Sequence, residues 1–342
     1  MADPRMPGLT LAEGNPGAGT QRARRPGIDK RTVRRIGHVL FALFRFAFLL
    51  ALSYIVLFPL IYMISNAFKP MAQIFDPTVI WVPKTLTLEN MAIVFKAMRF
   101  FESLGVSLRV GVVSAFIESF TCAVIAYGFA RFRFRENKLV FALVILTIII
   151  PPQSVVIPLY LNFTRLDFFG LLGAIGHALG QEIRPNLLDS PLTFYIPSVL
   201  GVGVRSGLFI FIYRQFFRGL PKELEEAAWI DGAGPIKTFL RIVIPSSGVA
   251  FLTVILFAII WHWNEYHLSV MYFNSEFPLS VSLSQIRNGL RLVTGFNEYG
   301  NPNQIRNLLM AGCLVFISPM LVLYLFMQKY FIRSIERVGI VG

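Results

Sequence analysis

The chain has 342 residues, of which 55% are hydrophobic and only 15% are charged. Soluble domains carry about 25% charged residues, so this composition, with a mean hydropathy of +0.62, excludes an ordinary soluble enzyme. The formal net charge of +13 fits either a nucleic-acid-binding protein or a membrane protein with basic cytoplasmic loops.

The N-terminal segment is rich in Pro, Gly and Arg and has no apolar periodicity. We expect residues 1–37 to form a disordered basic tail on the cytoplasmic side. The apolar segment that follows is too long for the hydrophobic region of a secretory signal peptide. A cleaved secretory leader is therefore not predicted.

Residues 38–342 contain several segments long enough to cross a bilayer, which takes about 20 mostly apolar residues in a helix. Lipid offers exposed backbone groups no hydrogen-bond partner, and the alternating pattern of a β-barrel is absent, so each span should be helical. The expected spans are residues 39–65, 104–129, 139–161, 192–213, 246–268 and 308–328. The sequence predicts an all-α integral membrane protein with six transmembrane helices.

Prolines and glycines predict departures from straight helices in two of these spans. They are Pro151, Pro152 and Pro158 in the third span, and Pro197, Gly201, Gly203 and Gly207 in the fourth. Prolines bend helices, and small residues let neighbouring helices approach closely.

The distribution of positive charge sets the orientation. The tail, residues 131–138, residues 214–241 and the C-terminal end hold more than twice as many Lys and Arg residues as the three loops on the other side. The positive-inside rule therefore places both termini in the cytoplasm. It also accounts for the net charge without nucleic acid.

The longest cytoplasmic loop has the features of two short helices. Pro221 suits the first position of a helix, and the glutamates after it suit the positive end of the helix dipole. We expect Gly232 to end this helix and Pro235 to begin a second one at a sharp angle. The expected docking surface for a partner consists of Leu224, Ala227 and Ala228. The alternative is a solvated amphipathic loop without a partner.

At fixed spacing, residues 218–245 contain Glu226, Ala227, Ala228, Asp231, Gly232, Ala233, Ile242, Ile244 and Pro245. This pattern resembles the EAA loop of binding-protein-dependent ABC importer permeases, with Ile244 where Leu is usual. In that family the loop forms coupling helices that sit in a cleft of the ATP-binding subunit, so the resemblance implies the same role here. The family often has a second proline soon after Pro245, where this chain has Ser246 to Val249.

Other segments resemble the carbohydrate branch of the family, in particular the smaller permease subunit of maltose-type systems. They are Asp231 to Ala233, Arg214 to Phe217, Ile157 to Tyr160, Trp263 to Tyr266 and the end of the sixth span. The resemblance covers about residues 40–342 and implies a sugar or oligosaccharide as solute. It also implies an ATP-binding cassette dimer, a second permease subunit and an external solute-binding protein as partners, and a C-terminal tail that touches the ATPase. The loop 173–189 is longer than usual. It could contact the partner permease or the binding protein, and its role is left open.

No phosphate-binding loop of the form GxxxxGK[ST] is present, since Ile236 stands where the glycine before Lys237 is needed. The chain should therefore not be an enzyme and should depend on a separate ATPase. Neither a cofactor nor a metal is expected. His38, His177, His262 and His267 form no ligand cluster in the sequence with cysteines or carboxylates. Cys122 and Cys313 lie in separate apolar segments and are expected to pack as free thiols.

The candidate substrate-pathway residues at the outer end of the fifth span are Trp263, Asn264, Glu265 and Tyr266. Their side chains could stack on a sugar and bond to it, or they could belong to the interfacial aromatic belt. Glu118 is a further candidate because charge deep in a span is costly. It could contact solute or pair with another subunit. Arg109 is about half a helical turn out of phase and should not face Glu118.

Together these features predict a multi-pass permease subunit in the bacterial inner membrane, with lipid around it, that forms the path for a sugar. The alternatives are an ABC permease for another solute and an ion-coupled secondary transporter. The latter would show inverted repeats around a midplane site, and no such repeat is visible in the sequence. Which sugar is carried, and whether the second permease is a distinct chain or another copy, is left open.

Overall fold

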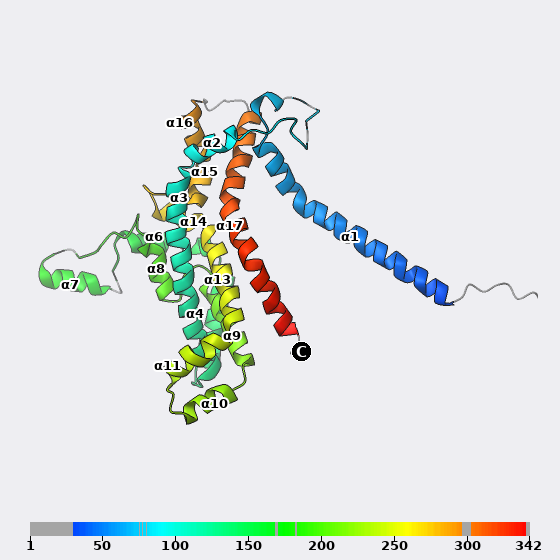
Figure 1. Cartoon of the computed structure of the whole chain (residues 1–342). Helices are drawn as coiled ribbons and strands as arrows, with labels where there is room; N and C mark the ends of the chain where they lie inside the picture. Colours follow the sequence, from blue (N-terminus) through cyan, green and yellow to red (C-terminus); the bar gives the residue numbers. More distant parts are fainter. Residues whose placement is uncertain are drawn as a thin grey trace, which may run out of the picture. The chain divides into compact units, whose positions relative to one another are not determined.

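The computed structural model describes residues 30–74, 76, 78–79, 81–167, 170–181, 183–295 and 302–339, and within these ranges the regular structure is helical without strands (Figure 1). Its internal contacts divide the chain into two units, Met1–Pro59 and Leu60–Gly342. An all-α architecture was predicted from the sequence and is confirmed for the described residues.

The first helix, α1, runs from Lys30 to Ala67 and contains Pro59. It begins inside the segment predicted as a disordered tail, so residues 30–37 are helical, while residues 1–29 lie outside the described residues. Within the first unit its large apolar side chains, from Val39 to Phe58, are exposed. Such a surface suits contact with lipid or with another apolar helix.

Within the part of the chain that the structure describes, three helices are long and apolar enough to cross a membrane, or four if a bent pair counts as one span. The three are Gly37–Ala67, Phe100–Arg131 and Gln304–Lys329. The second comprises α3 (Phe100–Ser107), a π-helical turn η2 (Leu108–Val112) and α4 (Val113–Arg131), and the third lies in α17 (Pro302–Gly339). They coincide with the first, second and sixth predicted spans.

The third and fourth predicted spans are interrupted. The third consists of α5 (Asn137–Ile149), a 3-10 turn η3 (Pro152–Ser154) and α6 (Val156–Thr164), with the break at Pro151. The fourth consists of α8 (Leu192–Val199) and α9 (Ser206–Gly219), separated by residues 200–205. A bend was predicted at the prolines, but the helices stop altogether. Gly201 and Arg205 have φ of 70° and 67°, values that a right-handed helix does not allow.

The fifth predicted span is α13 (Gly248–Trp263), which is shorter than expected because the chain turns at Asn264. The preceding helical segment Pro235–Ser246 meets α13 at a bend of 81°. The bend follows Pro245, which has no backbone N–H to continue the helix.

The core of the second unit is built around α4, which packs along α9 and α13 (Figure 1). Ala115, Ala123 and Ala126 of α4 are fully buried, so the backbones of these helices approach closely. Cys122 is a free thiol buried in the same cluster, and Cys313 is a free thiol that is partly buried. Packing of both cysteines as thiols was predicted and is confirmed.

At one end of α4 lies the predicted coupling loop, and at the other lies a group of short helices (Figure 1). These are α2 (Glu89–Ala97), α14 (His267–Tyr272), α15 (Leu279–Ser284) and α16 (Ile286–Thr294). Both α16 and α17 pack on α2. The long loop 173–189 includes most of α7 (Leu171–Leu179), and the pair Asp167–Arg184, at 3.1 Å, lies beside this helix.

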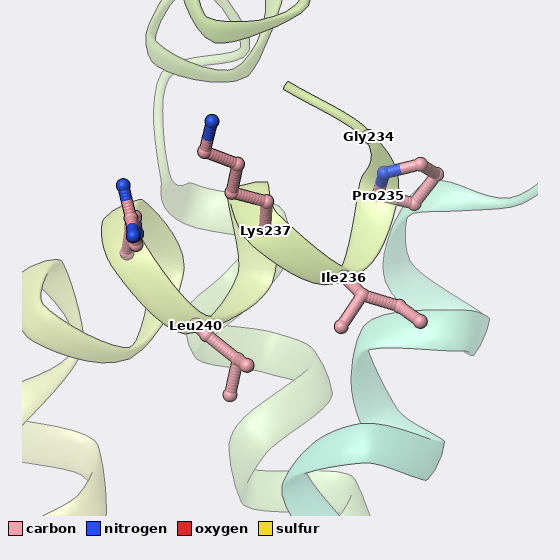
Figure 2. A pocket seen from close by; sticks show the side chains of 6 residues that line it. Gly234, Pro235, Ile236, Lys237 and Leu240 are labelled. Carbon is pink, nitrogen blue, oxygen red and sulfur yellow. The ribbon is translucent and has the colours of Figure 1, made fainter.

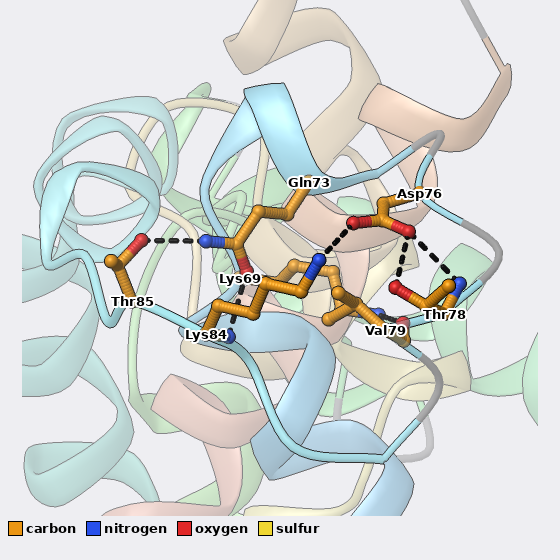
Figure 3. Close-up of polar contacts among 7 residues, drawn as sticks. All are labelled: Lys69, Gln73, Asp76, Thr78, Val79, Lys84 and Thr85. Carbon is orange, nitrogen blue, oxygen red and sulfur yellow. Dashed lines mark hydrogen bonds and ion pairs between the residues drawn. The ribbon is translucent and has the colours of Figure 1, made fainter.

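The connection between α1 and α2 is closed by polar contacts around the short turn η1 (Met71–Gln73) (Figure 3). Lys84 Nζ lies 2.6 Å from Asp76 Oδ2, and Gln73 Nε2 donates to Thr85 Oγ1 at 2.6 Å. Lys69 Nζ donates to the Val79 carbonyl at 2.8 Å. The hydrogen bond from Lys84 and those from Thr78 hold the pKa of Asp76 well below its usual range.

Candidate functional site

The first helix of the predicted coupling loop is α10, which runs from Glu223 to Ile230. It ends in a Schellman motif. The Ala233 N–H donates to the Ala228 carbonyl at 2.9 Å, and the Gly232 N–H donates to the Trp229 carbonyl at 3.0 Å. Gly232 has φ of 78°, which glycine adopts without strain. The prediction that Gly232 ends this helix is confirmed.

The second helix begins with Pro235 at its first turn, as predicted, and forms α11 (Pro235–Thr238). It continues as a π-helical turn, η5 (Phe239–Val243), and as α12 (Ile244–Ser246). Because Pro245 cannot donate to the carbonyl four residues earlier, the helical hydrogen-bond pattern changes there. The loop is therefore an elbow of two helices joined at Gly232.

One acidic side chain of α10 points inward. Glu225 Oε1 lies 2.5 Å from Arg131 Nε at the end of α4, and the two side chains are only 5% and 7% exposed. Tyr127 Oη donates to Glu225 Oε2 at 3.0 Å, and Arg131 Nη2 donates to the Leu220 carbonyl at 3.0 Å. These contacts fix α10 to the last turn of α4. From the sequence, Glu225 was expected only to interact with the helix dipole, because Arg131 belongs to a distant part of the chain.

The opposite face of α10 is exposed. Glu226, Ala227 and Asp231 are exposed, as are Leu224 at 45% and Ile230 at 86%. Ala228 was predicted to belong to the docking surface, but it is 5% exposed and packs inward. It follows Glu225 by three positions and so shares its face of the helix. The outward apolar surface is formed by Leu224, Ala227 and Ile230.

The second helix of the elbow has an open hollow of about 510 Å³, lined by Gly234, Pro235, Ile236, Lys237, Leu240 and Arg241. Figure 2 shows that Ile236 and Leu240 point to the same side, whereas Lys237 points away from them. Ile236 is 76% exposed and Leu240 is 46% exposed. Both helices of the elbow thus present apolar side chains that the described part of the chain does not cover.

A second cluster surrounds Glu118, which is fully buried. Ser206 Oγ donates to Glu118 Oε1 at 2.5 Å, and His262 Nε2 lies 2.7 Å from Glu118 Oε2. Here Glu118 contacts its own chain, whereas a solute contact or a pair with another subunit was predicted. His262 was expected to have no carboxylate partner. Sequence spacing gives no sign of either contact, because Ser206 and His262 lie 88 and 144 positions from Glu118.

Arg109 does not face Glu118, as predicted. Its guanidinium lies 2.9 Å from Glu276, and both side chains are exposed. The guanidinium of Arg205 lies over the ring of Trp261, at 4.5 Å from its centroid. Across the described residues, no group of three or more His, Cys, Asp and Glu side chains is arranged to hold a metal ion.

Residues 119–337, which include the elbow and most of the helices around it, match the family model described as binding-protein-dependent transport system inner membrane component. The chain belongs to this family. It is a permease, a transport component of an ABC importer, and it crosses the bacterial inner membrane more than once.

Relatives of the permease align along most of its length. The polygalacturonan/rhamnogalacturonan transport system permease protein YtcP of Bacillus subtilis is 27% identical over 300 residues, covering 86% of this chain and 96% of the relative. The arabinooligosaccharides transport system permease protein AraQ of Halalkalibacterium halodurans is 26% identical over 302 residues, covering 87% and 94%.

A solved structure shares the fold of the permease. A chain of a bacterial ABC transporter involved in the import of the acidic polysaccharide alginate matches with a TM-score of 0.63 and 23% identity. The match covers 89% of this chain and 99% of the other.

The four candidate pathway residues of the permease do not form one surface. Trp263 is 3% exposed and packs near the ring of Phe316, whereas Asn264 and Tyr266 are exposed. Glu265 is partly buried, and its Oε1 accepts from the Leu268 N–H at 3.0 Å at the start of α14. The end of α13 at Trp263 causes this division, because the following residues leave the helical register.

Proposed function

We propose that this permease forms the path by which a sugar or oligosaccharide enters the cell. An external solute-binding protein would deliver the solute, and a separate ATP-binding cassette dimer would supply the energy. The names of the relatives support this solute class, since they transport polygalacturonan or rhamnogalacturonan and arabinooligosaccharides. The alignments extend over more than four-fifths of this chain, so the proposal concerns the whole permease.

The proposed topology has six spans, with both termini and the elbow in the cytoplasm. Three spans are single long helices, and the other three contain the breaks and the bend described above. Interrupted helices suit a bundle that alternates between two conformations, because chain breaks absorb changes in backbone angle. The excess of Lys and Arg in the elbow and the other predicted inner segments supports the orientation.

The elbow is proposed to receive the force of ATP binding and hydrolysis. Its arrangement carries this proposal: α10 is held to α4 by Glu225 on one face and presents Leu224, Ala227 and Ile230 on the other. A short helix that is anchored on one side and apolar on the other suits docking in a groove of a partner. Coupling is proposed for the whole EAA set, which consists of Glu226, Ala227, Ala228, Asp231, Gly232, Ala233 and Pro245.

The solute path is proposed to include Asn264 and Tyr266, whose side chains are exposed. Glu265 lies between them and is partly buried. Trp263 and Glu118 are buried here and would reach a solute only after a rearrangement of α13 or α4.

Site-specific photocrosslinking tests the coupling role. A photoreactive amino acid replaces Ile230, which is 86% exposed on α10, or Leu292, which is 87% exposed on α16. In native membranes the Ile230 position should crosslink to an ATP-binding subunit, and the Leu292 position should not. The proposal fails if wild-type permease brings down no ATP-binding subunit, or if the two positions crosslink to it equally.

Growth on a panel of oligosaccharides after deletion of the gene tests the solute class. Loss of growth on one saccharide, restored by the wild-type gene, is the expected result. If growth and uptake stay normal on every saccharide of the panel, the permease carries a solute other than a sugar.

A further inference from the structure

Both helices that flank the elbow in the chain lead to the same buried carboxylate. The helix α9 enters the elbow and α13 leaves it, and at 1.5 Å per residue they are about 21 Å and 24 Å long. Ser206 is the first residue of α9, and His262 lies in the last turn of α13. Glu118 of α4 therefore joins the ends of α9 and α13 that lie away from the elbow.

The geometry of this junction is tight. Glu118, Ser206 and His262 are 0%, 3% and 6% exposed, and each carboxylate oxygen has its own partner, at 2.5 Å and 2.7 Å. A Cβ at Gly203 would lie 2.9 Å from Glu118 Oε1, so the chain break of the fourth span approaches the carboxylate through a glycine. The positive end of the α9 dipole also favours a negative group at this place.

The same helix, α4, holds the elbow at its other end. Arg131 and Tyr127, in the last turns of α4, bind Glu225 of α10. The elbow and its two flanking helices thus contact α4 through polar groups at both ends. A displacement of the elbow reaches the contacts of Glu118 by three routes: through α4, which is bound to Glu225, and through the chain connections to α9 and α13.

The junction around Glu118 is polar, but not all of its buried polar atoms have a hydrogen-bond partner. His262 Nδ1 is buried and has no hydrogen-bond partner among the described residues. Buried polar atoms without partners are rare and costly in proteins. A contact set with an unused ring nitrogen can exchange partners, as a contact made and broken during a cycle must do.

We propose that Glu118 is a positioning residue that couples the elbow to the break of the fourth span, residues 200–205, and to the end of α13. Its two contacts carry displacement of the elbow to these two points, where the helices end. This inference rests on the proposed function, since it requires that a partner ATPase moves the elbow.

Cysteine reactivity at the chain break tests the coupling with ATP alone. Val202 lies in the break and is 70% exposed, so Val202→Cys accepts a maleimide. The background carries Cys313→Ser, while Cys122 is fully buried and stays. The complex is purified with its ATPase, and labelling rates are compared without nucleotide and after trapping with ATP and orthovanadate.

Trapping should change the labelling rate by about fivefold or more in the Val202→Cys protein, the lower end of typical coupling between sites. With Glu118→Gln added, the change should fall below about twofold while ATP hydrolysis continues. Tyr213→Phe is the matched control. It removes a buried 2.6 Å hydrogen bond to Ser119 that also joins α9 to α4, but it leaves Glu118 intact and should preserve the change.

A second pair of variants keeps the test decisive if Glu118→Gln does not assemble. His262→Gln retains a hydrogen-bond donor toward Glu118. It should therefore preserve more of the trapping-dependent change in labelling rate than His262→Ala. The inference is overturned if trapping alters labelling equally with and without Glu118, or does not alter it in the wild-type background. Failure of the proposed function would give a different result: the purified wild-type permease would carry no ATPase activity.

Discussion

The energetic weight of the glutamates in α10 differs from residue to residue. Glu225 is paired with Arg131 where both side chains are almost fully buried, whereas Glu223 and Glu226 are exposed. Removal of one partner from a buried pair leaves an uncompensated charge and costs about 3–5 kcal/mol, while exposed pairs contribute about 0–1 kcal/mol. The middle glutamate of the loop is therefore the structural one.

Replacement of Glu225 should destabilise the permease much more than replacement of its exposed neighbour. Glu225→Gln should lower the free energy of unfolding by about 3 kcal/mol, because Arg131 loses its counter-charge. Glu223→Gln, on the same helix and exposed, should change it by less than about 0.5 kcal/mol. Denaturant titration of the purified protein in detergent measures both values. Equal effects would show that the buried pair does not hold α10 to α4.

For a single residue, the sequence identifies the chemical type of the side chain but not the side chains that it contacts. Glu118 stands out in the sequence because a carboxylate within an apolar span is unusual, and the structure does bury it. His262 stands out only as a neighbour of Trp263. Nothing in the spacing relates these two residues, since their contact depends on how α4 and α13 pack in three dimensions.

Among the elements, the elbow was predicted most closely. A proline at a helix start and a glycine at a helix end act through local backbone geometry, which a sequence specifies directly. The inward face of α10 was not predicted, because its orientation depends on Arg131 and Tyr127 of α4. Likewise, the prolines of the third span predict a disturbance but not that the helix stops.

Substitution of Gly232 should act through the backbone alone. A Cβ at Gly232 would meet nothing within 4 Å, yet φ is 78°, so a valine there costs about 1–2 kcal/mol in conformational strain. Gly232→Val should therefore abolish ATP-driven uptake while membrane insertion stays normal. Gly234→Ala is the control, because φ at Gly234 is −75° and a Cβ there also meets nothing.

Transport assays with insertion checked by fractionation decide this prediction. Gly232→Asn should retain more uptake than Gly232→Val, since asparagine tolerates the left-handed region. Normal uptake by Gly232→Val would show that the turn is not needed for coupling.

The packing of α9 on α5 leads to a separate prediction about stability. A Cβ at Gly207 would lie 3.1 Å from the Val144 carbonyl and 3.2 Å from Ile148 Cγ1, whereas one at Gly219, at the end of the same helix, meets nothing within 4 Å. Gly207→Val should destabilise the protein by about 1–3 kcal/mol through overpacking. Gly219→Ala should leave the midpoint of thermal unfolding almost unchanged. A similar loss of stability in both variants would contradict the close approach of α9 to α5.

For the whole molecule, composition and segment length were sufficient to predict a helical membrane protein. They were not sufficient for the interrupted spans. A hydropathy profile averages over residues 139–161 and 192–213 and cannot detect a chain break inside them. The helix ends within residues 192–213 depend on positive φ values at Gly201 and at Arg205, a residue type that rarely adopts them.

Labelling from one side of the membrane tests the proposed topology. Val82→Cys and Ile236→Cys replace side chains of nearly equal exposure, 78% and 76%, in the α1–α2 connection and in the elbow. In intact cells a membrane-impermeant maleimide should label only Val82→Cys, and permeabilisation should add Ile236→Cys. If only Ile236→Cys is labelled in intact cells, the orientation is opposite to the proposed one. If both variants are labelled in intact cells, the elbow lies outside the cell.

The uncovered apolar side chains of the elbow also bear on how the cell makes this protein. Ile230, Ile236 and Leu240 are exposed in the chain by itself, in a segment proposed to lie outside the bilayer. Exposed apolar surface of this kind promotes aggregation and attracts proteases when no partner covers it. Permease synthesised in excess of its ATPase should therefore be short-lived. Balanced synthesis of the two subunits would then determine how many importers the cell assembles.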